Sequence, residues 1–246
     1  MNPDPAGPAH VAFLLCGGAG TRLRGVTEQP KAVLPVAGWP FLKYHVESLA
    51  GIVERVVFLV GYGSEQVERT FGPATNDHVF VREYAPLGTG GALANAAPWA
   101  GDLNWVANGD SFVEVDPASV YAAHRAGPSP SDAATIVAVR LDDAADYGCL
   151  EIDADGRVTG FVEKGRGGTG WINAGVYVLP RSMLDELPAT AVSSLERDVF
   201  PRWAGEGRLR AHQLAGAFFR DIGTPERLAA AQQEFARIRR RLEGAR

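Results

Sequence analysis

Short apolar runs alternate along the chain with segments in which apolar residues recur at helical spacing. Residues 11–16, VAFLLC, are continuously apolar and end at glycines, which is typical of a strand buried on both faces. Further runs of this kind predict strands at 53–62, 78–84, 104–110, 133–141 and 171–180. Helical spacing and cap residues predict helices at 41–52, from the N-cap Ser64 to Gly72, at 90–100 and at 117–126. Strands that alternate with helices indicate an α/β fold built on a mainly parallel sheet.

The second half of the chain also contains antiparallel patterns. Two alternating runs within 149–164 surround Asp155-Gly156, a pair that favours a β-hairpin. A second hairpin is predicted over 209–223, around Gly216. The last helix opens at Thr224, a cap residue followed by proline at the first helical position. We therefore expect a mixed sheet flanked by helices, with a small antiparallel insert.

The length and composition suit one folded domain. The 246 residues and the apolar content of 46% are sufficient for a well-buried core. The opening MNPDPAGPAH is rich in proline and lacks the basic and apolar regions of a signal peptide. We expect a flexible tail at 1–10 and a single domain over 11–246.

The charge and the cysteine count exclude several classes of protein. The formal net charge of −5 argues against nucleic acid or an anionic membrane as a partner. No apolar run reaches the roughly 18 residues of a membrane-spanning helix. Cys16 and Cys149 are too few for a disulfide framework or a zinc cluster. A cytoplasmic protein is expected, and its oligomeric state, a homo-oligomer included, stays open.

A glycine-rich segment follows the first predicted strand. Gly17, Gly18 and Gly20 let the main chain turn sharply and bring N–H groups close to an anion. Arg22 and Lys31 follow within the same loop region and could neutralise a polyphosphate. The third glycine of a dinucleotide fingerprint and the Gly-Lys-Ser/Thr of a P-loop are both absent. By itself, the segment is also compatible with a glycine-rich turn that carries surface arginines.

Six blocks of sequence, in order, resemble the sugar-phosphate nucleotidylyltransferases. The resemblance covers roughly residues 11 to 235, nearly the whole chain. The blocks are Gly17 to Leu23 with Pro30-Lys31, Pro86 to Ala92, Asn108-Gly109-Asp110, Phe161 to Lys164, Asn173 to Tyr177, and Asp221 to Pro225. The resemblance implies a Rossmann-like fold of the nucleotide-diphospho-sugar transferase type. It also implies the reaction of a nucleoside triphosphate with a sugar 1-phosphate, which yields a nucleotide sugar and pyrophosphate.

The same resemblance implies roles for residues at the matching positions. Catalytic roles fall on Arg22, Lys31 and Asp110. Nucleotide-binding positions are Leu15, Gly17, Gly18, Gly20, Thr21, Arg22, Lys31, Glu83, Leu87, Gly88 and Gly109. Sugar-phosphate positions are Tyr147, Gly148, Glu163, Lys164 and Asn173. Asp110 and Asp221 are implied as ligands of Mg²⁺, for which hard carboxylate oxygens are suitable.

Physical chemistry supports this reaction class independently. The attacking group is a phosphate oxygen that already carries charge, so the reaction needs cations and positioning rather than a general base. Only three of the 24 basic residues are lysines, and two of them, Lys31 and Lys164, fall at the phosphate positions of the family. A non-catalytic sugar-nucleotide-binding regulatory subunit is the rival from another class, and the retained aspartates and lysines argue against it.

Within the family, the chain most resembles the D-glycero-D-manno-heptose 1-phosphate guanylyltransferases. The resemblance implies GTP and a heptose 1-phosphate as substrates, for polysaccharide or natural-product glycosylation. The alternatives are a mannose 1-phosphate guanylyltransferase and a uridylyl- or thymidylyltransferase that acts on a hexose 1-phosphate.

Overall fold

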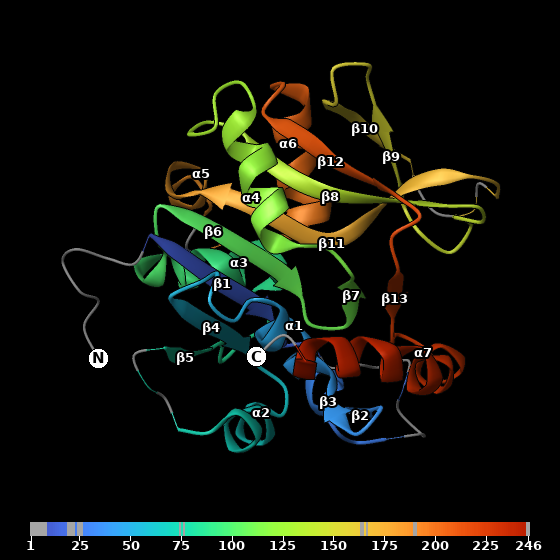
Figure 1. Ribbon diagram of the computed structural model, residues 1–246. Coiled ribbons are helices and arrows are strands. Elements are labelled where there is room, and N and C mark those ends of the chain that lie inside the picture. The colour runs from blue at the N-terminus through green and yellow to red at the C-terminus, as the bar shows by residue number, and fades with distance from the viewer. Residues whose placement is uncertain are drawn as a thin grey trace.

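The computed structural model describes residues 9–18, 23, 27–73, 75, 77–162, 165, 167–188 and 191–244. Most of the tail expected at 1–10 lies outside these residues, but its last position, His10, is already the first residue of a strand. Figure 1 shows a twisted central sheet with helices on both faces and one long helix, α7, below it.

The central sheet contains nine strands in the described part of the chain, and its main path runs β5-β4-β1-β6-β11. Beyond β11 the sheet continues through β8 to β12, and the β9–β10 hairpin also joins β11. The strands are β1 (His10–Leu15), β4 (Arg55–Val60), β5 (His78–Arg82), β6 (Leu103–Asn108), β8 (Ala134–Leu141), β9 (Cys149–Ile152), β10 (Val158–Val162), β11 (Gly170–Pro180) and β12 (Leu209–Ala215).

The directions of the strands confirm the mainly parallel mixed sheet that the sequence predicts. Strands β5, β4, β1 and β6 are mutually parallel, and β12 is parallel to β8. Strand β11 is antiparallel to both β6 and β8 and so separates the two parallel groups. The β9–β10 hairpin forms the antiparallel insert, with its turn at the expected Asp155-Gly156, and projects at the upper right of Figure 1.

Helices cover both faces of the sheet. The helices are α1 (Phe41–Ser48), α2 (Ser64–Phe71), α3 (Gly88–Asn95), α4 (Pro117–Ala126), α5 (Arg181–Asp185), α6 (Phe200–Gly205) and α7 (Pro225–Gly244), with 3₁₀ turns at Lys31–Val33 and Ala97–Trp99 and a π-helical segment at Leu195–Val199. Along β1, Val11 and Phe13 pack with residues of α3, α5 and α6, whereas Ala12 and Leu14 pack with residues of α1, α2 and α4. This division explains why β1 is continuously apolar from Val11 to Leu15.

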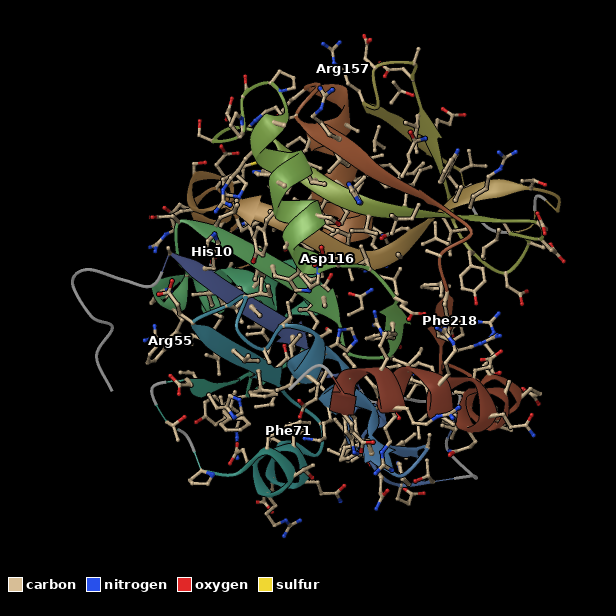
Figure 2. The ribbon with its side chains drawn as sticks, viewed as in Figure 1. His10, Arg55, Phe71, Asp116, Arg157 and Phe218 are labelled. Carbon is tan, nitrogen blue, oxygen red and sulfur yellow. The ribbon has the colours of Figure 1, made fainter. Side chains whose placement is uncertain are left out.

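A third apolar cluster attaches α7 to the rest of the molecule. Phe235 and Ile238 of α7 are fully buried and pack with Phe41 and Tyr44 of α1. Two small sheets border this cluster: β2 (Pro35–Val36) with β3 (Trp39–Pro40), and β7 (Ser111–Val113) with β13 (Phe219–Asp221). Phe218, labelled in Figure 2 just before β13, also lies against Phe235 at 5.5 Å between ring centroids. The cluster thereby fixes the strand that carries Asp221.

The hairpin predicted over 209–223 is wrong. Strand β12 pairs with β8 in the central sheet, whereas β13 pairs with β7 in a separate small sheet. Gly216, at φ +75°, turns the chain between the two sheets. An alternating pattern shows which face of a strand is buried, but it does not show which strand is its partner, so two adjacent strands were assigned to each other.

Several predicted boundaries also change. Ser64 is the first residue of α2 rather than its cap, because Gly63 at φ +66° holds the N-cap position. The helix predicted at 90–100 runs from Gly88 to Asn95 and is followed by a separate 3₁₀ turn. Asp116, labelled in Figure 2, caps α4 by accepting the Ala118 N–H at 3.0 Å.

Candidate active site

A cavity of about 770 Å³ opens beyond the carboxyl ends of β1, β4, β5 and β6. Ligands bind at this edge in open α/β sheets, because the loops that leave the strands diverge there. Eight of the residues with predicted nucleotide-binding or catalytic roles line the cavity: Leu15, Gly17, Gly18, Lys31, Glu83, Gly88, Gly109 and Asp110. The fold therefore collects in one place residues that come from three strand ends, the start of α3 and a 3₁₀ turn.

The other predicted site residues that the structure describes lie outside the cavity lining. Leu87 is half-buried beside the cavity, and its N–H donates to Glu83 Oε2 at 3.1 Å, so it orients the carboxylate rather than lining the cavity. Gly20, Thr21, Arg22, Glu163 and Lys164 lie outside the described residues, and their roles stay predictions.

Glu83 follows β5 and places its carboxylate against the glycine loop. A Cβ built on Gly17 or on Gly61 would lie only 2.7 Å from Glu83 Oε1, so glycine at both positions leaves room for this oxygen. Among the described residues, Leu87 donates to Oε2 and no group donates to Oε1. The bare backbone expected to accommodate phosphates thus also admits a carboxylate whose Oε1 has no donor among the described residues.

Lys31 and Asp110 form an ion pair within the cavity lining. The Lys31 Nζ donates to Asp110 Oδ2 at 2.8 Å, and the two side chains are 14% and 42% exposed. Lys31 lies in the 3₁₀ turn that follows Pro30, and Asp110 lies between β6 and β7. An ammonium group and a carboxylate therefore stand side by side at the cavity surface.

The small β7–β13 sheet brings Asp221 next to Asp110. Asp221 pairs in register with Ser111, and the Ile222 N–H donates to the backbone oxygen of Asp110 at 2.9 Å. The two aspartates that the sequence predicts as metal ligands are thus on adjacent backbone segments. No group of three or more His, Cys, Asp or Glu side chains that could hold a metal ion occurs among the described residues.

Asp221 is held by several donors. The Tyr147 hydroxyl donates to Oδ2 at 2.5 Å, and Arg227 Nη1 contacts Oδ2 at 2.9 Å and Oδ1 at 3.1 Å. Gly223 N–H donates to Oδ1 at 2.9 Å. Burial alone would raise the pKa of Asp221, but the hydrogen bonds from Tyr147 and Gly223 and the charge of Arg227 hold that pKa below its ordinary value. Asp221 is therefore a carboxylate with a strong preference for the charged form.

Asn173 belongs to a polar network that extends into the cavity. Its Nδ2 donates to the Tyr177 hydroxyl at 2.9 Å and to Glu196 Oε1 at 3.3 Å, and its Oδ1 accepts the Gly175 N–H at 2.8 Å. Burial and the nearby charge of Glu196 raise the pKa of Tyr177 well above its ordinary value.

Gly148 is half-buried beside Tyr147, and a Cβ there would meet only the Val162 oxygen at 3.6 Å.

Glu196 is a cavity residue that the sequence interpretation missed. It lies in the π-helical segment, a rare geometry that is frequent at functional sites. The preceding Ser193 docks on α3, because its oxygen accepts the N–H groups of Gly90 and Gly91 at 2.9 and 3.3 Å. A Cβ on Gly88 would lie 2.4 Å from that oxygen. A polar side chain in a helical segment far along the chain carries no local signal for this contact.

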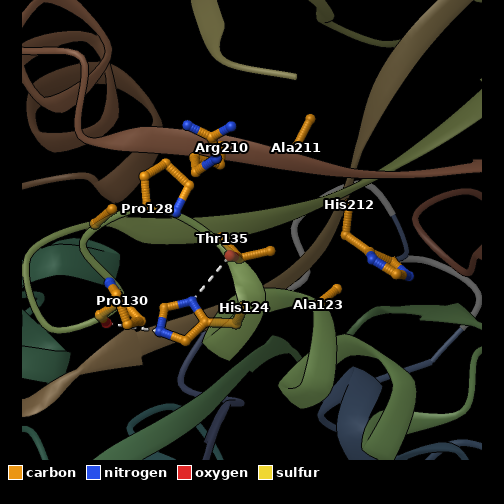
Figure 3. Close-up of a pocket in the computed structure, with 10 residues that line it drawn as sticks. Ala123, His124, Pro128, Pro130, Thr135, Arg210, Ala211 and His212 are labelled. Carbon is orange, nitrogen blue, oxygen red and sulfur yellow. Dashed lines mark hydrogen bonds between the residues drawn. The ribbon is translucent and has the colours of Figure 1, made fainter. Parts of the chain in front are cut away.

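A second, much smaller cavity of about 60 Å³ lies between α4, β8 and β12 and is shown in Figure 3. His124 Nε2 is 2.8 Å from the Pro130 oxygen, which can only accept, so this nitrogen carries the proton. Nδ1 then accepts from the Thr135 hydroxyl at 2.9 Å. Both ring nitrogens are satisfied, and burial lowers the pKa of His124, so this histidine is structural.

The class of the protein follows from this arrangement and from a family comparison. Residues 11–237 match the family model described as Nucleotidyl transferase, and the chain belongs to that family. Relatives that match the chain include proteins named mannose-1-phosphate guanylyltransferases. The predicted family is confirmed.

The chain is similar to individual members of the family over most of its length. The chain is 36% identical over 234 residues to "Mannose-1-phosphate guanylyltransferase" of Mycobacterium tuberculosis, which covers 92% of this chain and 64% of that protein. It is similar to the crystal structure of HddC from Yersinia pseudotuberculosis, with a TM-score of 0.79, 34% identity and coverage of 92% of this chain and 99% of HddC. The HddC structure complexed with GMP-PN has a TM-score of 0.77 and 32% identity and covers 92% and 99% of the two chains.

The extent of these matches differs. The chain spans between 59% and 64% of the length of the curated relatives that it matches.

Within the described ranges, none of the helices combines the length and the apolar character needed to cross a membrane.

Proposed function

We propose that the protein transfers GMP from GTP to a manno-configured sugar 1-phosphate and releases pyrophosphate, with D-glycero-D-manno-heptose 1-phosphate as the first candidate sugar. The observation that carries this proposal is the 770 Å³ cavity, in which Glu83, the glycine loop and the Lys31–Asp110 pair face one space. The similarity to HddC over 99% of its length, and the GMP-PN complex of that protein, support a guanine nucleotide.

Glu83 provides a physical basis for the choice of guanine. Its Oε1 accepts no hydrogen bond from the described residues and can take the N–H donors of the guanine N1 and N2 edge. Uracil and thymine offer a single N–H between two carbonyl oxygens, and those oxygens would be repelled by the carboxylate. GTP is therefore the triphosphate expected to bind best.

The reaction needs no general base. A charged oxygen of the sugar 1-phosphate attacks the α-phosphorus of GTP, the bond from that phosphorus to the bridging oxygen breaks, and pyrophosphate leaves. Lys31 is placed to neutralise charge on the phosphates, since its ammonium group lines the cavity beside the glycine loop. Glu196 would contact sugar hydroxyls because it lines the cavity, and Asn173, which donates to Glu196, would do so from beside it.

Asp110 and Asp221 are the residues that would hold Mg²⁺. Two carboxylates on adjacent backbone segments supply the hard oxygen ligands that this ion prefers. Asp110 is 42% exposed, and no described residue donates to its Oδ1, so this carboxylate is accessible to an ion. When bound, the ion would supply charge neutralisation at the reacting phosphates.

Pyrophosphate release from defined substrate pairs tests the proposal. GTP with the heptose 1-phosphate is expected to react fastest, ahead of GTP with mannose 1-phosphate and of UTP or dTTP with glucose 1-phosphate. Glu83→Gln should reduce the preference for GTP over UTP, whereas the exposed Glu65→Gln on α2 should leave it unchanged. Preference for UTP or dTTP would refute guanylyl transfer. Binding of GTP without turnover of any pair would indicate a regulatory subunit.

Mannose 1-phosphate is the second candidate sugar, because the curated relatives of the chain are named mannose-1-phosphate guanylyltransferases. A heptose carries one more hydroxylated carbon than mannose. A site built to hydrogen-bond that hydroxyl would leave polar groups unpaired when mannose binds. The ratio of kcat/KM for the two sugars decides between them.

A further inference from the structure

Arg227, in the first turn of α7, is a charged residue near the site to which the proposed reaction assigns no role. Its side chain is 19% exposed and contacts two carboxylates, Asp221 through Nη1 and Asp146 through Nη2 at 2.6 Å. The guanidinium carbon also lies 4.9 Å from the centre of the Tyr147 ring. Two carboxylates and an aromatic ring thus fix the position of the guanidinium at the end of β13.

The contacts of Arg227 leave Asp221 no free acceptor position. A carboxylate offers about four acceptor positions. Arg227 and Gly223 donate to Oδ1, and Arg227 and Tyr147 donate to Oδ2. A divalent cation can therefore bind Asp221 only if a donor leaves. Of these donors, the guanidinium carries the full positive charge that repels a cation.

We propose that Arg227 occupies Asp221 in place of the divalent cation and, when the cation binds, turns its guanidinium to the phosphate of the sugar 1-phosphate. The proposal rests on the function proposed above. In this proposal, Arg227 binds the phosphate of the sugar 1-phosphate. Binding of the cation to Asp221 therefore increases the affinity of the protein for the sugar 1-phosphate.

The chemistry of the side chain suits this exchange of partners. A guanidinium donates to phosphate oxygens as it does to carboxylate oxygens, so a phosphate can accept from Nη1 in place of Asp221. Asp146, whose side chain is 75% exposed, and the Tyr147 ring keep the guanidinium near the site when Asp221 is taken. Arg227 carries its charge at every pH at which proteins are folded.

Arg220 provides a matched control for a purely structural role. It lies on β13 and pairs with Glu234 of α7 at 2.5 and 2.7 Å, so it also joins these two elements. Its side chain is 29% exposed, and among the described residues it donates no hydrogen bond to Asp221, although its charge acts on that carboxylate. If Arg227 only attached α7 to β13, replacing either arginine would lower the thermal midpoint of unfolding. The affinities for Mn²⁺ and for the sugar 1-phosphate would then not change.

Titration of Mn²⁺, followed by electron paramagnetic resonance without nucleotide or sugar, tests the exchange at Asp221. Arg227→Met should bind Mn²⁺ about tenfold or more tightly than the wild type, because a charge-assisted contact no longer competes. Arg227→Lys should be intermediate, and it keeps the measurement possible if the methionine variant does not fold. Arg220→Lys keeps the charge that acts on Asp221 but loses the forked contact with Glu234, and it should match the wild type. The gain should vanish when Asp221→Asn is combined with Arg227→Met.

Steady-state kinetics tests the contact with the phosphate. Arg227→Met should raise the KM for the sugar 1-phosphate about tenfold or more and change the KM for GTP by less than about twofold. Unchanged or weaker Mn²⁺ binding in Arg227→Met, or equal increases in both KM values, would overturn the inference. Failure of the wild type to release pyrophosphate from any substrate pair would instead refute the proposed function, and the Mn²⁺ titration would still decide the competition at Asp221.

Discussion

His45 should make the stability of the protein depend on pH in a way that a single variant isolates. The side chain lies on α1, is almost fully buried, and packs edge-on against the rings of Phe41 and Phe112. Its Nε2 is 2.8 Å from the Ser111 oxygen, which can only accept, so Nε2 carries the proton of a neutral ring. Burial lowers the pKa of His45 to about 4, against a smaller opposing effect of this hydrogen bond.

The sign and size of the effect follow from proton linkage. An unfolded histidine has a pKa of about 6.5, so the unfolded chain binds the proton first as the pH falls. Stability is therefore complete above about pH 6.5 and is lost as the pH falls toward the folded value of about 4. With these two pKa values, His45 alone costs about 2 kcal/mol between pH 7.5 and pH 5, and about 3 kcal/mol below pH 4.

Urea unfolding of the wild type and His45→Gln at pH 7.5, 6.5 and 5 measures this contribution. Glutamine can still donate an N–H to the Ser111 oxygen but does not titrate. The pKa values of His10, His124 and His212 are also lowered, and their effects cancel because both proteins contain them. His45→Gln should be less stable at pH 7.5, and the gap should narrow by about 2 kcal/mol at pH 5. Parallel curves for the two proteins would refute the reasoning.

Three further predictions concern the site and its support. Asp110→Ala should abolish pyrophosphate release without changing the circular dichroism spectrum, and EDTA should silence the wild type; an unchanged rate would contradict the metal assignment. Gly88→Ala should lower the thermal midpoint more than Gly51→Ala, because both have positive φ but only the Cβ at Gly88 meets Ser193, at 2.4 Å; equal losses would remove that contact as the cause. Phe235→Ala should lower the free energy of unfolding in urea by about 3–5 kcal/mol, because this fully buried ring packs α7 against the rest of the molecule. A decrease below about 1 kcal/mol would show that the cluster does not stabilise the attachment of α7.

Much of the fold could be predicted from local patterns. The run at 11–16 marks β1 because a strand covered on both faces must be apolar at every position, and both faces are indeed covered. Asp155-Gly156 marks the β9–β10 turn because the turn needs a residue at positive φ, which Gly156 adopts. Gly17, Gly18 and Asp110 meet in one cavity because each follows a strand end at the same edge of the sheet, and Lys31 joins them from a 3₁₀ turn.

Other parts of the site had no local signal. Glu196 reaches the cavity only because Ser193 docks on the N-terminus of α3, a contact between segments far apart in the chain. Arg227 reads in the sequence as an ordinary charged residue in the first turn of a helix. Only the fold places its guanidinium between Asp146 and Asp221.

The sequence by itself determined the type and order of the elements, the turn residues and the family blocks, since periodicity, caps and glycine conformation are properties of neighbouring residues. Only the tertiary structure decided that β12 joins β8, that β13 joins β7, and that Asp221 therefore lies beside Asp110. The physical reason is that the side-chain period specifies which face of a strand is buried, whereas the choice of its partner depends on the burial and hydrogen bonding of the whole chain.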